Sequence, residues 1–99
     1  MDFTQSAQAL HNLVRGMNPW PVARTTLHGK LLKVLATSPL ADWKKGEPGQ
    51  VLESGERLVV ACGQGALALE RVQLEGSKPM ASRDFLRGHP VEKGTFLGQ

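Results

Sequence analysis

Residues 49–74 read GQVLESGERLVVACGQGALALERVQL, and this stretch indicates the architecture of the chain. It holds three mostly apolar runs, 49–53, 57–62 and 66–74, which are separated by short turns that contain glycine. Runs of this length between glycine turns are typical of β-strands. A helical crossover needs a dozen or more residues, and neither turn is that long. We therefore predict three consecutive strands without an intervening helix.

Two more strands are predicted before this block and one after it. Residues 24–28 contain β-branched side chains, Gly29 makes a turn, and residues 30–37 form the next strand. Alternate side chains of a strand point to opposite faces, so the uniformly apolar set of this strand is expected to face the core. That set consists of Leu32, Val34 and Ala36. Residues 94–98 are expected to form a closing edge strand.

The N-terminal residues 1–18 are predicted to contain a helix. Ser6 is a candidate N-cap, because a serine hydroxyl accepts hydrogen bonds from the free N–H groups of a first helical turn. Apolar residues at helical spacing follow it, namely Ala7, Leu10, Leu13, Val14 and Met17. Pro19 ends the helix, since proline disfavours helical geometry in the residue before it. Residues 19–23 are interpreted as a stiff connector in which Trp20 is an anchor.

A second, short helix is predicted over residues 82–87, with Gly88 just beyond its C-terminal end. The whole pattern favours a small barrel or sandwich, because short strands with glycine turns show no alternation with long helices. We predict a mainly β fold: a small open Greek-key β-barrel of the oligonucleotide-binding type, with an N-terminal helix and a short C-terminal helix. Residues 1–99 then form a single domain with its barrel at 24–99.

Composition limits the classes of protein to which the chain can belong. Its 99 residues suit one domain, and an apolar share of 40% is too high for a disordered chain. No apolar run approaches the ~18 residues that span a bilayer, and the first residues lack the basic and apolar regions of a secretory signal. The single cysteine, Cys62, excludes an internal disulfide. We therefore expect a cytoplasmic protein that makes no membrane contact.

No recognisable catalytic constellation occurs in the sequence. His11, His28 and His89 are scattered and show no zinc spacing. The glycine pair within residues 63–65 precedes a predicted strand, whereas a phosphate loop needs Lys-Ser/Thr at the start of a helix. We predict no catalytic residue, no metal site and no cofactor site in this domain.

Positive charge is concentrated in the first half of the chain. Residues 1–45 carry six basic and two acidic side chains, whereas residues 46–99 carry six basic and seven acidic ones. A basic half favours a polyanionic partner, although it also suits an ordinary solubilising surface. Trp43, beside Lys44, is interpreted either as a ring that stacks on a nucleotide or as a ring folded back on the barrel. The residues predicted to bind RNA phosphates are Arg24, Lys30, Lys33, Lys44, Lys45, Lys78 and Arg87.

Several motifs, in order along essentially the whole chain, resemble the C-terminal domain of the methionyl-tRNA formyltransferase family. The most specific are NPWP at residues 18–21 and the pattern Q-x-x-G-x-K-x-M at residues 73–80. The others lie at residues 30–34, 48–52, 58–67, 84–88 and 94–98. Val22 departs from the family pattern, which commonly has glycine there, and Ser77 stands where a second lysine is common. The second departure weakens the prediction that the loop with Lys78 clamps a phosphate.

The resemblance implies a function for the complete protein. An absent N-terminal catalytic domain transfers a formyl group from 10-formyltetrahydrofolate to the methionine of initiator methionyl-tRNA, and the present domain positions that tRNA without catalysing. The complete enzyme is expected to be a monomer. The alternative is the structural C-terminal domain of a related sugar or folate formyltransferase, which stabilises its catalytic partner through apolar surface at Phe3, Met17 and Trp20.

Overall fold

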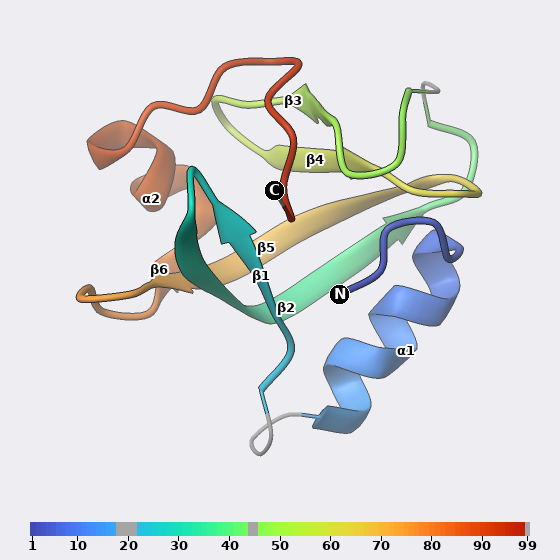
Figure 1. Cartoon of the computed structure of the whole chain (residues 1–99), viewed down its shortest axis with the longest axis horizontal. Coiled ribbons are helices and arrows are strands. Elements are labelled where there is room, and N and C mark those ends of the chain that lie inside the picture. The colour runs from blue at the N-terminus through green and yellow to red at the C-terminus, as the bar shows by residue number, and fades with distance from the viewer. Residues whose placement is uncertain (18–21, 44–45, 99) are drawn as a thin grey trace.

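The computed structural model describes residues 1–17, 22–43 and 46–98, which form a curled β-sheet with a helix before and after it in the chain (Figure 1). The elements are α1 (Ala7–Met17), β1 (Arg24–Leu27), β2 (Lys30–Leu40), β3 (Val51–Glu53), β4 (Leu58–Ala61), β5 (Ala66–Leu74), β6 (Met80–Ala81) and α2 (Ser82–Gly88). The named strands pair antiparallel in the order β1-β2-β5-β4-β3, and β6 pairs with β5. This confirms the predicted mainly β fold with a helix toward each end of the chain.

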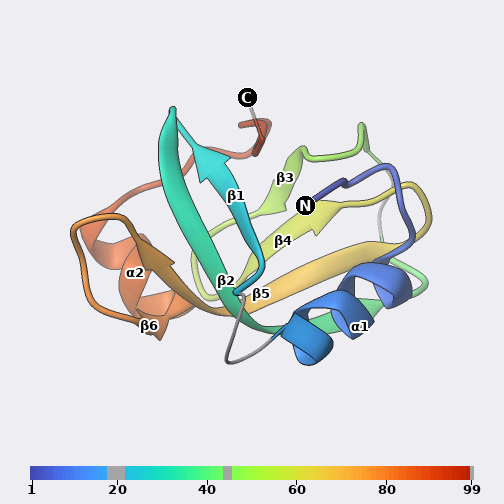
Figure 2. The same cartoon turned by 60° about the horizontal axis from the view of Figure 1, so that its bottom comes forward.

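The connection between β2 and β3 gives the sheet its topology. Strands β3, β4 and β5 are neighbours in chain order, but β2 pairs with β5 and not with β3. Three consecutive strands with a fourth placed beside one end of the set make a Greek key. The long strand β2 bends as it leaves the β1–β2 hairpin, so the sheet curls into an open half-barrel (Figure 2).

Two irregularities in the pairing of β2 with β5 change which side chains face the core. Register shifts occur between Val34 and Ala36 and again between Ala36 and Thr37. A shift of one residue turns a side chain to the opposite face. Ala36 therefore lies opposite Arg71, which is exposed, while Thr37 is buried. The prediction was right for Val34 and wrong for Ala36, because simple alternation ignores bulges.

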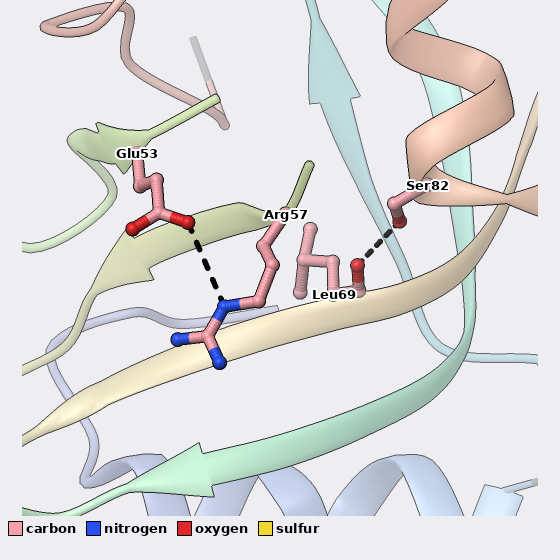
Figure 3. Close-up of polar contacts among 4 residues, drawn as sticks. All are labelled: Glu53, Arg57, Leu69 and Ser82. Carbon is pink, nitrogen blue, oxygen red and sulfur yellow. Dashed lines mark hydrogen bonds and ion pairs between the residues drawn. The ribbon is translucent and has the colours of Figure 1, made fainter. Parts of the chain in front are cut away.

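The main hydrophobic core lies between the curled sheet and both helices. Its largest fully buried side chains include Leu10, Leu32, Leu58, Leu69 and Phe85. The hydroxyl of Ser82 donates a hydrogen bond to the backbone carbonyl of Leu69, which joins the start of α2 to β5 (Figure 3). Phe3 is 5% exposed and belongs to this core, so it does not offer the apolar docking surface of the alternative function.

The first helix has the predicted cap and most of the predicted apolar face. The backbone N–H of Ala9 donates to the Ser6 hydroxyl at 3.1 Å, as an N-cap requires. Leu10 and Val14 are buried, but Leu13 is 38% exposed and lies at the margin of the face. Residues 18–21 of the predicted connector, Trp20 among them, lie outside the described residues.

The C-terminal segment links the two ends of the sheet. The Val51 N–H donates to the carbonyl of Thr95 at 2.7 Å, and the Gly98 N–H donates to the carbonyl of Thr26 at 2.9 Å. The segment therefore contacts both β3 and β1, the two outer strands of the order. It forms an isolated bridge between Gln50 and Phe96 and not the predicted strand over 94–98.

Candidate nucleic-acid interface

Two predicted phosphate-binding residues face each other across the β1–β2 hairpin. Arg24 and Lys33 are Cα partners in the antiparallel register, and Lys33 is also the partner of Gln73 on β5. Directly opposed residues of neighbouring strands project from the same face of a sheet. Arg24, Lys33 and Gln73 therefore form a polar row across three strands, on the face away from the buried Leu32 and Leu74. We call this surface the outer face.

Arg71 enlarges the outer face, and the sequence prediction missed it. It is exposed on β5, two residues before Gln73, and residues two apart on a strand share a face. Diagonal neighbours on adjacent strands lie about 7–8 Å apart, within reach of long side chains. The two-residue spacing of Arg71 and Gln73 shows in the sequence that both project from the same face of β5. The sequence does not show that β5 lies beside β2, which is what brings Arg71 to the outer face.

The cations of the outer face have no carboxylate partner within the described part of the chain. The ion pairs found there join Arg57 to Glu53 (Figure 3) and Arg87 to Asp84, each at 3.6 Å. Arg87, one of the predicted phosphate-binding residues, is thus already paired. The carboxylate of Glu75, at the edge of the outer face, accepts a hydrogen bond from the backbone N–H of Leu31.

The remaining predicted phosphate-binding residues occupy other places. Lys30 begins β2 at the end of the hairpin, and Lys78 is exposed in the turn between β5 and β6. That turn and α2 lie at one end of the molecule, whereas the loop that follows β2 lies at the other (Figures 1 and 2). Lys44 and Lys45 lie outside the described residues. The five predicted cations that the structure describes therefore do not form one patch, and Arg24 with Lys33 is the pair among them that the sheet brings together.

Trp43 adopts the second of its two predicted arrangements, with its ring folded back on the barrel. It packs against a small apolar cluster that includes Val59 and Ala68 of the neighbouring strands β4 and β5. The guanidinium of Arg57 lies over the ring, 5.0 Å from its centroid, a distance at which cation and ring attract. Stacking on a nucleotide would require the ring to leave this site.

The described residues do not hold a cluster of side chains that could bind a metal ion. No three His, Cys, Asp or Glu side chains come together among residues 1–17, 22–43 and 46–98. His11 is engaged with the hydroxyl of Thr37 at 2.8 Å, which ties α1 to β2. Neither helix in the described part of the chain has the length and apolar character of a membrane-spanning helix.

Cys62 is expected to be unreactive in the folded protein. Burial raises the pKa of its thiol to about 11, so little thiolate is present at pH 8. We expect iodoacetamide to alkylate Cys62 about a hundredfold more slowly in the native protein than in urea, in proportion to the thiolate fraction. Mass spectrometry over a time course measures both rates, and equal rates would contradict the burial of this thiol.

The same thiol makes stability depend on pH in the alkaline range. The unfolded thiol loses its proton near its ordinary pKa of 9.0, whereas the folded thiol keeps it up to about 11. The folded state then holds more protons, so the free energy of unfolding falls as the pH rises between these values. Urea denaturation at pH 8 to 11 should show this decrease, and Cys62→Ala should show a smaller one. The same pH profile for both proteins would contradict the assignment.

Comparison with known proteins gives three findings. A family model described as "Formyl transferase, C-terminal domain" matches residues 1–90. A Lachnospira eligens protein named "Methionyl-tRNA formyltransferase" is 45% identical to this chain, and the match covers all of this chain and 33% of that protein. A Gluconobacter oxydans protein of the same name is 47% identical, and the match covers 98% of this chain and 32% of that protein. The chain thus spans about a third of the curated relatives it matches.

A solved structure of HypX from Aquifex aeolicus, in complex with tetrahydrofolic acid, has a similar fold. It aligns with all of this chain and 20% of its own, with a TM-score of 0.71 and 23% identity. The arrangement of strands and helices therefore recurs within a much longer protein.

Proposed function

The chain belongs to the family of formyl transferase C-terminal domains, and from this premise we propose that it is the tRNA-binding part of a methionyl-tRNA formyltransferase. In this proposal the complete enzyme transfers a formyl group from 10-formyltetrahydrofolate to the amino group of methionine on initiator tRNA. The catalytic residues and the folate site belong to the remaining two thirds, roughly, of a protein as long as the relatives. The complete enzyme works as a monomer in the cytoplasm, where its tRNA is.

The observation that carries the proposal is the opposition of Arg24 and Lys33. Like charges directly opposite each other on neighbouring strands repel and destabilise a sheet. No carboxylate of the described residues forms an ion pair with either side chain. A phosphate group placed between them would remove the repulsion and gain charge-assisted hydrogen bonds. The amide of Gln73 in the same row can donate to the same phosphate or to a ribose hydroxyl.

Contacts of this kind position an RNA without reading its sequence. Phosphate contacts fix the register and orientation of a nucleic acid, whereas base contacts carry sequence information. Arg24, Lys33 and Arg71 lie on strands of a hydrogen-bonded sheet, so their backbone positions are held rigidly. The outer face can therefore orient a tRNA so that its aminoacyl end reaches an active site on another domain. Selection of the initiator tRNA would then rest with the catalytic domain.

The salt dependence of tRNA affinity tests the proposal. Neutralised phosphates release their counterions, so the logarithm of the association constant falls linearly with the logarithm of salt concentration. If the chain engages about four phosphates, the slope should be near −3. Fluorescence anisotropy with labelled tRNA at several NaCl concentrations measures this slope. An affinity that stays constant as salt increases would overturn the proposal.

A purely structural role for this domain is the competing function. It predicts tight docking to the separated catalytic domain, added in trans, together with no measurable affinity of the 99-residue chain for tRNA. Phe3 is buried in the core of this domain, so it is not available to dock against a catalytic domain. Isothermal titration of this chain with the catalytic domain and with tRNA distinguishes the two functions.

A further inference from the structure

A hollow of about 290 Å³ lies where the β1–β2 hairpin meets the C-terminal end of α2. Buried apolar side chains, Leu27, Leu74 and Val91, line its inner part. Three exposed nitrogen-bearing side chains, those of His28, Lys30 and His89, also line it. None of the residues that line the hollow is acidic. The combination of an apolar wall and basic groups suits a ligand with a flat apolar part and a negative charge.

The ring of His89 is held in a defined orientation by α2. It stacks on Phe85 with the ring centroids 5.0 Å apart and the planes inclined by 11°. Phe85 is 1% exposed, so it is a fixed base for the imidazole, whereas His89 itself is exposed. The His89 backbone N–H also donates to the carbonyl of Phe85 at 2.9 Å. An imidazole that is packed on one side and exposed on the other can serve as a stacking surface.

His28 occupies a backbone conformation that is uncommon for residues other than glycine. Its φ is +51°, and among the described residues it is the one non-glycine position with a positive φ. Gly29 has a φ of +80°, and the two residues together occupy the central positions of a tight hairpin turn. Turns of this type favour Asn or Asp followed by Gly. This turn requires a positive φ at both central positions. The turn holds the His28 imidazole at the edge of the hollow.

We propose that this hollow binds one unstacked nucleotide of a single-stranded RNA segment. The inference rests on the proposed function, because it assumes that this domain contacts RNA. The base stacks on His89 against the apolar wall, and Lys30 with His28 binds the adjoining phosphate. Single-stranded RNA is commonly recognised by splayed bases that stack on aromatic side chains, histidine included. The volume lies near the lower limit for ligand pockets, which suits a single nucleotide.

The affinity of the 99-residue chain for a five-nucleotide oligo(A) RNA, compared with a blunt RNA duplex, tests this assignment. Stacking of one base on an aromatic side chain corresponds to about fivefold or more in affinity. We therefore expect His89→Ala to weaken oligo(A) binding at least about fivefold and to leave duplex binding within about twofold, because the duplex presents no free base. His89→Phe should retain oligo(A) affinity. Unchanged oligo(A) affinity in His89→Ala would overturn the proposal.

A second pair of variants separates the ligand contact from the stability of the turn. Asparagine suits the first position of this turn, so His28→Asn should fold with an equal or higher urea midpoint. The same variant should bind oligo(A) about threefold more weakly, as should Lys30→Gln, because each loses a phosphate contact. The exposed Lys93 of the C-terminal segment provides the charge-matched control, and Lys93→Gln should change oligo(A) affinity little. Equal losses in Lys30→Gln and Lys93→Gln would overturn the assignment.

Inorganic phosphate as a probe distinguishes a nucleotide site from a plain anion site. We expect both ligands to shift the NMR signals of Lys30 and His28, and phosphate to do so with much lower affinity than oligo(A). Only oligo(A) should shift the signals of His89, because phosphate has no base to stack. Phosphate that binds as tightly as oligo(A) would overturn the nucleotide assignment. If the outer-face variant loses tRNA affinity but His89→Ala keeps its oligo(A) affinity, the hollow proposal is wrong and the proposed function stands. If His89→Ala loses oligo(A) affinity but the outer-face variant keeps its tRNA affinity, the hollow proposal is supported and the outer face is not the tRNA site.

Discussion

Replacing Gly63 by alanine is expected to lower the free energy of unfolding by about 3 kcal/mol, a large share of the total for a small domain. A Cβ atom at this position would lie 1.9 Å from the backbone carbonyl oxygen of Thr4 and 2.7 Å from its carbon. These are backbone atoms and cannot rotate away. The Gly63 N–H also donates to the carbonyls of Phe3 at 2.8 Å and Gln5 at 3.0 Å, so the N-terminal segment would have to leave its hydrogen-bond partner.

Gly16→Ala is the matched control for this prediction. Among the described residues, no heavy atom outside the local helix lies within 4 Å of a Cβ built at Gly16. This position is exposed within α1, where alanine is favoured over glycine by about 1 kcal/mol. The same substitution should therefore stabilise the protein at one glycine and destabilise it at the other. Urea denaturation followed by circular dichroism measures both, and a Gly63→Ala protein as stable as the parent would contradict the close approach.

Reversing both charges of the opposed pair, in Arg24→Glu with Lys33→Glu, should weaken tRNA binding on the order of thirtyfold at low salt. Two phosphate contacts are lost, and each is replaced by repulsion between carboxylate and phosphate. The salt slope should become shallower by about 2, one for each lost contact. Because both members of the pair change sign together, they remain like charges across the hairpin. The repulsion within the sheet is thus retained, and we expect little change in the urea midpoint.

The control for the double reversal changes the net charge of the chain by the same amount. Arg83 and Lys93 are exposed and lie off the outer face, one on α2 and the other in the C-terminal segment. We expect Arg83→Glu with Lys93→Glu to weaken binding only by its general effect on net charge, with the salt slope nearly unchanged. If this control loses as much affinity as the variant of the outer face, then tRNA responds to total charge and not to the opposed pair.

Much of the fold follows from short-range patterns in the chain. The glycine-containing turns around residues 54–56 and 63–65 interrupt the extended chain. They therefore fix where β3 and β4 end and where β4 and β5 begin. The cap at Ser6 depends on contacts with residues three positions away and was predictable for that reason. The opposition of Arg24 and Lys33 is also local, since the two-residue turn at His28 and Gly29 sets the register of the hairpin.

Other features depend on partners far along the chain, and local patterns carry no information about them. Ala36 and Thr37 exchange faces because β2 pairs with β5, more than thirty residues later, through two register shifts. Arg71 joins the basic surface for the same reason.

The amino-acid pattern alone was sufficient for the class of fold, most strand positions and the presence of the first hairpin, because each depends on turns and periodicity within about ten residues. The register that opposes Arg24 and Lys33 was seen only in the structure. The packing of the whole chain was needed to bring His28 and His89 to the same hollow, Trp43 beneath Arg57, and the C-terminal segment into contact with β1 and β3. Those contacts arise when the sheet curls around its core. Bulges bend the strands, and the close backbone approach at Gly63 holds the N-terminal segment; both depend on residues distant in sequence.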